Sequence, residues 1–221
     1  MNILIITGGD IREDFASSFV KGKNYDEIIA VDGGLAAADC LGIRPTHLVG
    51  DFDTIRPDIL DKYMAMTDIQ IHAFDPVKDN TDTDIAVLLA IKLCKGREKS
   101  SRIDILGALG SRADHMLANL LLLLKPHRAG IPAFIYDPCN RISVAGKDQE
   151  LIKSQIYGDF ISLIPLTERV GGLTLEGFKY PLDQAETFMG DSLCVSNELT
   201  APIGHIHIGE GCMLLVESKD A

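Results

Sequence analysis

Residues 1–10 read MNILIITGGD, an apolar run that stops at two glycines and an aspartate. Short apolar runs recur along the first part of the chain, and stretches with helical spacing separate them. The strand candidates are 2–7, 27–31, 47–49, 69–73 and 102–106, and the helix candidates are 12–21, 35–41, 57–64, 82–95 and 113–125. Alternation of this kind predicts a parallel sheet covered by helices.

The helix candidate at 82–95 has the clearest start signal. Thr81 is placed to cap it, and Asp82 and Asp84 fall in its first turn, where negative charge is favourable. Its apolar positions follow the i, i+3, i+4 spacing of one helix face.

The pattern changes after residue 126. From about residue 141 onward, no segment longer than a turn or two has helical spacing. Short strand-like runs separated by turn residues take its place: 141–144, 150–154, 159–166, 172–175, 192–196, 205–208 and 212–217. This spacing predicts a small sandwich or barrel. The segment 131–140 contains Pro132 and Pro138 and is interpreted as a bridge between the two parts.

Length and net charge limit the classes of partner that the chain can have. The chain has 221 residues, enough for one large domain or two small ones. It carries 21 Lys and Arg against 32 Asp and Glu, a formal net charge of −11. A nucleic-acid partner needs a basic face, so this charge argues against one. Nucleotides stay possible, because a metal ion held by carboxylates turns an acidic site into a phosphate site.

Nothing in the sequence indicates export or a membrane partner. The N-terminal segment has no basic region, and Gly8 interrupts its apolar run. No apolar stretch approaches the roughly 20 residues that span a bilayer. The five cysteines form no C-x-x-C pair, which argues against a zinc site or a disulfide framework. We therefore expect reduced thiols and a cytoplasmic protein.

Glycines and carboxylates recur directly after the strand candidates. In an open α/β sheet, ligands bind outside the carboxyl ends of the strands. The residues at these positions are Gly8-Gly9-Asp10, Asp32-Gly33-Gly34, Gly50-Asp51-Phe52-Asp53, Lys78-Asp79-Asn80-Thr81-Asp82 and the segment 107–115. Each glycine pair alone is typical of a turn. Their recurrence at one edge of one sheet predicts a binding site.

Asp51 and Asp53 stand out within an acidic segment. Residues 51–84 hold three basic residues against nine acidic ones, a net charge of −6. Most of these charges are expected on a solvated surface or at helix caps. Two carboxylates at positions i and i+2 repel each other unless a cation joins them, and Mg²⁺ prefers oxygen ligands together with substrate phosphate. The spacing alone leaves a metal site and a solvated acidic loop as equal alternatives.

A glycine-rich turn leads into a helix over residues 107–115, which read GALGSRADH. Backbone N–H groups at a helix N-terminus attract anions, and Arg112 adds a fork of donors suited to phosphate. The alternative is an ordinary helix start, because the segment lacks the Lys-Ser/Thr of a P-loop.

Two further sequence features are weaker indications of a functional site. His205 and His207 would share one face of a strand, but no third metal ligand is evident. We interpret them as structural. The segment Val195-Ser196-Asn197-Glu198 reads on its own as a turn.

Five groups of residues occur together in a fixed order: Asp32-Gly33-Gly34, Gly50-Asp51-Phe52-Asp53, Lys78-Asp79-Asn80-Thr81-Asp82, Gly107 through Asn119 with Gly110-Ser111-Arg112 and Asp114-His115, and Ser196-Asn197-Glu198. This set closely resembles the thiamin pyrophosphokinase family, in particular its bacterial members. The resemblance implies an α/β fold with an N-terminal parallel-sheet (Rossmann-like) domain over 1–130, followed by a small all-β sandwich domain over 138–221. It also implies a homodimer with active sites between subunits.

The resemblance further implies a reaction and a set of site residues. The pyrophosphoryl group of ATP would pass to the hydroxyl of thiamin, giving thiamin diphosphate and AMP with Mg²⁺ as the cofactor. The implied catalytic carboxylates are Asp51, Asp53, Asp79 and Asp82, and the metal ligands among them are Asp51, Asp53 and Asp82. The residues implied near ATP and its phosphates are Asp32, Gly33, Lys78, Thr81, Arg112, Asp114 and His115. Ser196 and Asn197 match the segment that lines the thiamin or nucleotide pocket.

Other functions fit the same residues less well. One alternative is a pyrophosphokinase that acts on another alcohol, such as a hydroxymethylpterin. Another is a non-catalytic sensor of thiamin or nucleotide, but a binding module has no need of three converging carboxylates. A metal-dependent phosphatase would need a water-activating group, and the sequence identifies none.

Overall fold

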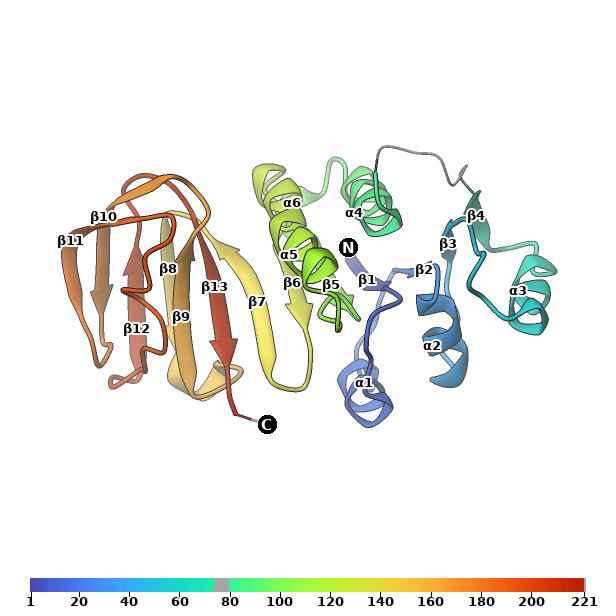
Figure 1. Cartoon of the computed structure of the whole chain (residues 1–221), viewed down its shortest axis with the longest axis horizontal. Helices are drawn as coiled ribbons and strands as arrows, with labels where there is room; N and C mark the ends of the chain where they lie inside the picture. Colours follow the sequence, from blue (N-terminus) through green and yellow to red (C-terminus); the bar gives the residue numbers. More distant parts are fainter. Residues whose placement is uncertain (74–79, 221) are drawn as a thin grey trace. The chain divides into compact units, whose positions relative to one another are not determined.

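The computed structural model describes residues 1–73 and 80–220. The chain divides into two compact units, Met1–Pro138 and Cys139–Ala221 (Figure 1). Among the described residues, no helix combines the length and the apolar character that crossing a bilayer requires.

A parallel sheet forms the centre of the first unit. Its strand order is β4-β3-β2-β1-β5-β6, and every neighbouring pair runs parallel. The strands are β1 (Asn2–Ile6), β2 (Glu27–Val31), β3 (His47–Gly50), β4 (Gln70–Ala73), β5 (Arg102–Leu106) and β6 (Ala133–Tyr136). The apolar side chains of β1 are completely buried, as expected of a central strand covered on both faces.

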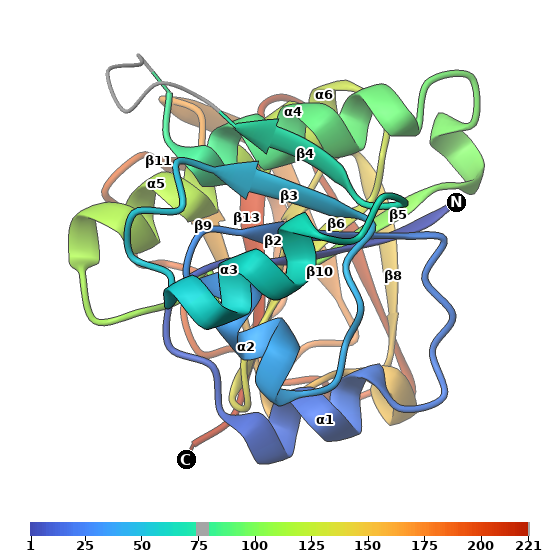
Figure 2. The same cartoon turned by 90° about the vertical axis from the view of Figure 1, so that its right-hand side faces the viewer.

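Helices cover both faces of this sheet. Figure 2 shows α1, α2 and α3 on one side and α4, α5 and α6 on the other. The helices are α1 (Glu13–Val20), α2 (Gly34–Cys40), α3 (Pro57–Met64), α4 (Asp82–Leu93), α5 (Ala113–Leu122) and α6 (Leu124–Arg128), with a short 3₁₀ turn at Glu98–Ser100. The capping role expected of Thr81 is confirmed, because its Oγ1 accepts a hydrogen bond from the N–H of Asp84 at 3.2 Å.

The winding of the sheet reverses beside β1. The chain adds β2, β3 and β4 on one side of β1, then crosses over and adds β5 and β6 on the other. The loops that follow β1 and β5 therefore lead to helices on opposite faces of the sheet, α1 and α5 (Figure 2). Open α/β sheets hold their ligands at the carboxyl ends of the strands, where such a reversal occurs.

Two antiparallel sheets enclose the core of the second unit. One has the order β7-β13-β9 and the other β11-β10-β12-β8. The strands are β7 (Asn140–Ala145), β8 (Asp148–Ile152), β9 (Phe160–Pro165), β10 (Arg169–Glu176), β11 (Leu182–Phe188), β12 (Ile203–His207) and β13 (Met213–Ser218). Side chains from both sheets, among them Leu163, Leu173 and Met213, form one buried cluster. The unit is a β-sandwich, which resolves the choice between sandwich and barrel.

Two segments of the first unit differ from the sequence prediction. Residues 131–140, interpreted as a bridge, contain β6, which pairs with β5. Pro132 precedes the strand, so its missing N–H removes no hydrogen bond from the ladder. The single helix expected over 113–125 is divided between α5 and α6. Pro126 cannot donate to the carbonyl four residues earlier, which interrupts the helix there.

Two segments of the second unit also differ. Residues 192–196, expected to be a strand, form turns. The sequence did not indicate β11, whose residues LDQAETF include a single fully buried position. β11 lies at the edge of its sheet, where a strand needs no regular apolar pattern.

Candidate active site

A cavity of about 570 Å³ lies at the carboxyl ends of the parallel strands in the first unit. Its walls come from the segments that follow β1, β2 and β5 and from the first turns of α4 and α5. The residues with a role expected from the sequence that line it are Asp32, Gly33, Thr81, Asp82, Arg112 and His115. Loops far apart in the chain therefore meet at one place, as the strand-end pattern predicted.

The loops after β1 and β5 touch at Gly9 and Gly107. A Cβ on Gly9 would overlap the carbonyl oxygen of Gly107. Gly107 has a φ of 75°, a conformation that glycine adopts without steric cost. The two glycines allow the backbones to approach closely at the point where the winding of the sheet reverses.

Asp32 is the most perturbed carboxyl group of the cavity. It follows β2 with a φ of 43°, and its buried Oδ1 has no hydrogen-bond partner among the described residues. A Cβ at Gly50 would overlap this oxygen. The pKa of Asp32 is raised to about 7, first by burial and then by a hydrogen bond shared with Asp82 and by the charges of Asp82 and Asp51. A hydrogen bond from the backbone N–H of Phe52 acts in the opposite direction. Carboxylates from three loops therefore crowd together.

Asp51 and Asp53 lie on a tight turn after β3. Phe52 between them is buried and has a φ of 61°, and the N–H of Asp53 lies 3.3 Å from Oδ1 of Asp51. Asp53 is exposed and Asp51 half-buried. Neither lines the cavity directly, and Asp51 acts on it through its repulsion of Asp32.

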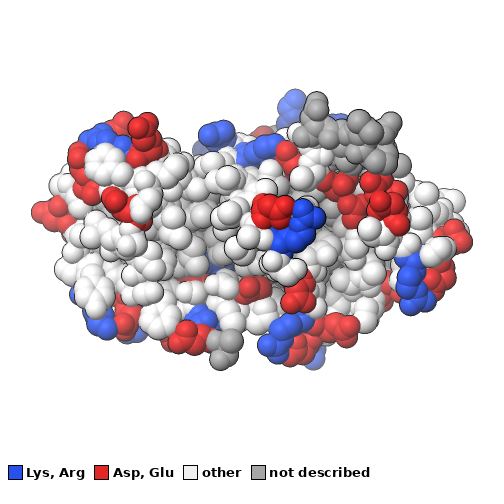
Figure 3. Space-filling model, in the orientation of Figure 1, with Lys and Arg blue, Asp and Glu red and all other residues white. Residues whose placement is uncertain are grey.

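The donor atoms of this site suit a hard divalent cation. Carboxylate oxygens are the ligands that Mg²⁺ prefers, and a cation beside Asp32 and Asp82 would offset the repulsion between their carboxylates. Figure 3 shows Asp and Glu side chains on both units, with one group of them on the first unit. Among residues 1–73 and 80–220, no three His, Cys, Asp or Glu side chains already converge on one metal position. The fit is one of donor chemistry and charge, without a preformed coordination shell.

Arg112 stands at the start of α5 and forms a two-point ion pair with Asp114. Its Nε and Nη2 donate to the two carboxylate oxygens at 3.2 and 2.7 Å, and both side chains are exposed. This pair and the N–H of His115 lower the pKa of Asp114 to about 2. The remaining guanidinium N–H groups of Arg112 are available to a phosphate.

The same pair occurs at two other helix starts. Arg12, directly before α1, binds Asp14 in the first turn of that helix, and Arg56, directly before α3, binds Asp58 in the first turn of α3. An arginine two residues before an aspartate is therefore a recurring helix-start arrangement in this chain. The position of Arg112 distinguishes it, because it lines the cavity and Arg56 does not.

The other expected ATP-binding residues lie at helix N-termini or outside the described part. Gly33, Thr81 and His115 line the cavity at the starts of α2, α4 and α5. Lys78 and Asp79 lie outside the described residues. Their expected contacts with a phosphate and with the acceptor hydroxyl stay predictions.

Thr7 and Asn119 also line the cavity, although no role was predicted for either of them. Both are buried, and both donate to carbonyl groups of the loop after β5. Thr7 reaches this loop only because β1 pairs with β5. A hydroxyl at a strand end and an amide within a helix carry no local signal of such contacts.

Ser196 and Asn197 belong to the second unit. Asn197 is buried, and its amide binds the backbone of Tyr180 at both groups: Oδ1 accepts from the N–H at 3.0 Å and Nδ2 donates to the carbonyl at 2.9 Å. Ser196 is exposed and has a φ of 57°. Asn197 therefore holds a turn together, and Ser196 is the member of the pair that a ligand can reach.

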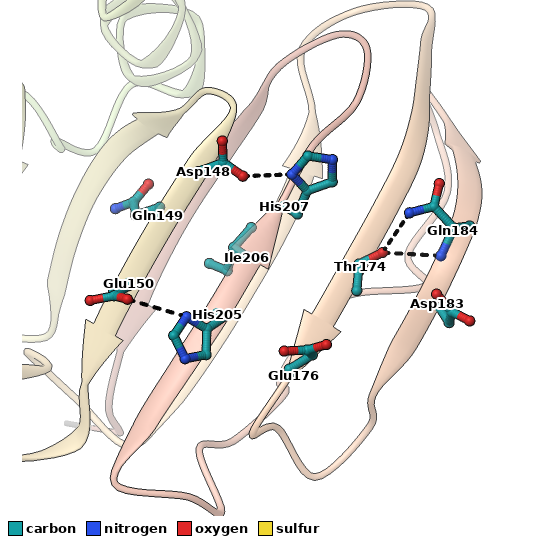
Figure 4. Close-up of a pocket in the computed structure, with 10 residues that line it drawn as sticks. All are labelled: Asp148, Gln149, Glu150, Thr174, Glu176, Asp183, Gln184, His205, Ile206 and His207. Atoms are coloured by element: carbon teal, nitrogen blue, oxygen red, sulfur yellow. Dashed lines mark hydrogen bonds and ion pairs between the residues drawn. The ribbon is translucent and has the colours of Figure 1, made fainter.

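A second cavity, of about 640 Å³, lies on the outer face of the sheet β11-β10-β12-β8 (Figure 4). His205 and His207 share this face, as their spacing predicted. Each Nδ1 faces a carboxylate of β8, with 2.6 Å from His207 to Asp148 and 3.4 Å from His205 to Glu150. These are cross-strand pairs, in keeping with a structural role. Glycine loops, helix N-termini and crowded carboxylates come together at the strand ends of the first unit instead.

Two family models match the chain, one in each unit. The model described as thiamin pyrophosphokinase, catalytic domain, matches residues 21–135. The model described as thiamin pyrophosphokinase, vitamin B1 binding domain, matches residues 148–213.

Individual proteins show the same similarity over nearly the whole length. Thiamine pyrophosphokinase of Bacillus subtilis strain 168 is 33% identical over 192 residues, which cover 87% of each chain. A crystal structure of thiamine pyrophosphokinase from Bacillus subtilis matches with a TM-score of 0.86 at 30% identity over 100% of both chains. One of thiamin pyrophosphokinase from Geobacillus thermodenitrificans matches with a TM-score of 0.83 at 31% identity, over 100% of this chain and 99% of that one. The similarity therefore extends over both units.

Proposed function

The chain belongs to the thiamin pyrophosphokinase family, and we propose that it transfers the pyrophosphoryl group of ATP to the hydroxyl of thiamin. The products are thiamin diphosphate and AMP. One observation carries this proposal: the catalytic-domain model matches the unit that holds the carboxylate cavity, and the vitamin B1 binding model matches the other unit.

The transfer forms one P–O bond and breaks another. The hydroxyl oxygen of thiamin attacks the β-phosphorus of ATP and gives up its proton. The bond between the β-phosphorus and the oxygen that bridges it to the α-phosphorus breaks, and AMP leaves with that oxygen. Such a transfer depends on in-line positioning and on neutralising phosphate charge. The task of the protein residues is therefore to hold and orient the two substrates.

Asp51, Asp53 and Asp82 are the proposed ligands of Mg²⁺. The crowding of carboxylates around Asp32 and the unpartnered Oδ1 of that residue support a cation at this place. When bound, the ion neutralises phosphate oxygens and makes the phosphorus more electrophilic.

The loop 107–112 and the start of α5 are the proposed phosphate site. Backbone N–H groups at a helix N-terminus favour an anion, and Arg112 lines the cavity beside them. Lys78 is proposed to share the phosphate charge. These groups would hold the triphosphate so that AMP faces away from the acceptor.

The acceptor side of the site is proposed to use the acidic surroundings and the second unit. Thiamin carries a positive thiazolium ring, which an acidic surface attracts. Ser196 lies on an exposed turn within the part matched by the vitamin B1 binding model, and Asn197 shapes that turn. Asp79 or Asp82 would orient the thiamin hydroxyl.

We further propose a cytoplasmic homodimer with active sites between subunits. The second unit exposes several large apolar side chains, which favours an interface: Ile164, Phe188, Met189, Leu193 and Val195. The cysteine pattern supports the location. Light scattering on the purified chain tests the dimer, since a molar mass near 24.0 kDa, that of one chain, would contradict it.

Product analysis tests the function. Incubation with thiamin, ATP and MgCl₂ is expected to give AMP and thiamin diphosphate in equal amounts, and EDTA is expected to stop the reaction. AMP formation with a hydroxymethylpterin but not with thiamin would favour the other acceptor. Thiamin binding without any product would favour the sensor.

A further inference from the structure

Two buried side chains hold successive carbonyl groups of the loop after β5. Thr7, at the end of β1, donates from Oγ1 to the carbonyl of Gly107 at 2.6 Å. Asn119, within α5, donates from Nδ2 to the carbonyl of Ala108 at 2.9 Å. Thr7 is 3% exposed and Asn119 8% exposed. The loop is therefore fixed from two sides, by a strand and by a helix.

These bonds set the direction of two backbone N–H groups. In a trans peptide the carbonyl and the next residue's N–H point in opposite directions. Fixing the carbonyls of Gly107 and Ala108 therefore fixes the N–H groups of Ala108 and Leu109. Within the described part of the chain, neither N–H has a hydrogen-bond partner. Two donors of fixed direction are thus left for a ligand, in a loop that borders the cavity.

The loop has little room to adjust if either bond is lost. The carbonyl of Gly107 lies against Gly9, where a Cβ would overlap it. A Cβ built on Gly107 itself would lie 2.5 Å from the carbonyl oxygen of Thr7. Close packing of this kind restricts the loop to small shifts, so we expect the loss of one bond to misalign the two N–H groups without unfolding the loop.

We propose that Thr7 and Asn119 are positioning residues that orient the loop 107–112 for the phosphates of a nucleotide. The proposal rests on the proposed function, which supplies the nucleotide. Neither residue need touch the substrate: each acts through the backbone carbonyl that it holds. A purely structural role would lower stability and leave nucleotide affinity unchanged.

Isosteric replacement of Thr7 separates the two roles. Thr7→Val keeps the shape and removes the donor, and Thr7→Ser keeps the hydroxyl. We expect Thr7→Val to weaken binding of a non-hydrolysable ATP analogue with Mg²⁺ by about tenfold, the upper range for one hydrogen bond. We expect kcat to fall by up to about a hundredfold, as for a reacting group displaced by about 1 Å. The KM for thiamin should not change, and Thr7→Ser should restore binding to within about twofold.

A threonine in the same unit provides the matched control. Thr46 also donates its hydroxyl to a backbone carbonyl, that of Ile28 at 3.1 Å. It precedes β3, at the opposite end of the strands from the cavity. Thr46→Val is therefore expected to lower stability by an amount comparable to Thr7→Val. Its affinity for the ATP analogue should equal that of the wild type.

Asn119→Leu, an uncharged replacement of similar shape, tests the second contact and replaces Thr7→Val if that variant does not fold. It removes the amide donor, and we expect a similar loss of analogue affinity. The double variant should lose less than the product of the two single losses, because both residues fix one loop.

Two results would overturn the proposal. One is analogue affinity within twofold of the wild type in folded Thr7→Val and Asn119→Leu. The other is a Thr7→Ser variant as weak as Thr7→Val, which would assign the loss to packing. A wild-type chain that binds the analogue but makes no thiamin diphosphate would contradict the proposed function and leave the positioning result standing.

Discussion

Carboxylates of the site lie in different surroundings, and this decides what their removal does. Asp32 has a buried oxygen without a partner among the described residues and a raised pKa. Asp53 is exposed, so removing it leaves no buried group unsatisfied. Replacing Asp53 should therefore change turnover without changing the stability of the fold.

Asp53→Ala should abolish most turnover and leave the fold intact. We expect kcat to fall by about a hundredfold or more, a loss typical of one electrostatic group aimed at a transition state. The free energy of unfolding should stay within about 0.5 kcal/mol of the wild type. Steady-state kinetics and urea unfolding measure the two quantities. Asp68→Ala is the control, because Asp68 is exposed and pairs with Arg44. Full activity of Asp53→Ala at ordinary Mg²⁺ would remove Asp53 from the metal site.

Arg112→Ala should weaken the use of ATP. Loss of a charged donor to phosphate is expected to raise the KM for ATP by about tenfold or more. Stability should change little, because the pair with Asp114 is exposed. Arg56→Ala removes the same kind of pair from the start of α3 and should keep the wild-type KM. Equal KM values in the two variants would show that Arg112 acts only at the helix start.

At the scale of elements, the turn around Asn197 connects two segments of the sandwich. Isolated bridges join Ile161 to Asn197 and Phe178 to Leu199. The amide of Asn197 adds its bonds to the backbone of Tyr180. One buried side chain thus organises the turn that presents Ser196.

Asn197→Ala and Ser196→Ala should behave differently for this reason. Asn197→Ala leaves buried backbone groups without partners, and we expect it to cost about 1–3 kcal/mol of unfolding free energy. Ser196→Ala should keep stability. Both should raise the KM for thiamin. Urea unfolding measures the stability of both variants, and steady-state kinetics measures their KM for thiamin. An unchanged free energy of unfolding in Asn197→Ala would contradict the role of its amide.

His47 on β3 and His72 on β4 are expected to make the parallel sheet sensitive to acid. His47 on β3 is 1% exposed, with Nδ1 3.2 Å from Nε2 of His72 and Nε2 3.2 Å from Oε2 of Glu27. Burial lowers the pKa of both histidines, and Glu27 opposes this effect at His47. The folded state therefore takes up protons at lower pH than the unfolded chain does.

Stability should consequently fall as the pH drops below about 6.5, the pKa of an unfolded-chain histidine. Above that pH the contribution of the neutral histidines is complete, and below it the unfolded state binds protons first. Urea unfolding between pH 7.5 and 5.5 measures this slope. His47→Gln should make the slope shallower, whereas His205→Gln, at an exposed histidine, should not. Identical slopes in the wild type and His47→Gln would contradict the assignment.

At the scale of the whole molecule, the sequence predicted the features that depend on local pattern. Strand ends marked by glycine and aspartate, such as Gly8-Gly9-Asp10, indicated the parallel sheet and the edge that carries the cavity. The cap at Thr81 was predicted because this threonine directly precedes a helical pattern with Asp82 and Asp84 in its first turn. These signals are local because each depends on backbone conformation within a few residues.

Contacts between distant segments could not be predicted in this way. The bond from Thr7 to Gly107 joins residues 100 positions apart, and the bonds of Asn197 to Tyr180 depend on how the sandwich pairs its turns. The edge strand β11 lacks the alternation that marks a half-buried strand. The position of the site was therefore predictable from the sequence, but the contacts of the buried residues that shape it were not.

Labels on the individual phosphorus atoms of ATP show whether the chain transfers a pyrophosphoryl group. With thiamin, Mg²⁺ and ATP labelled separately at the α, β and γ positions, we expect the β and γ labels to enter thiamin diphosphate together. The α label should appear only in AMP. A γ label in thiamin monophosphate with the β label in ADP would show attack at the wrong phosphorus and contradict pyrophosphoryl transfer.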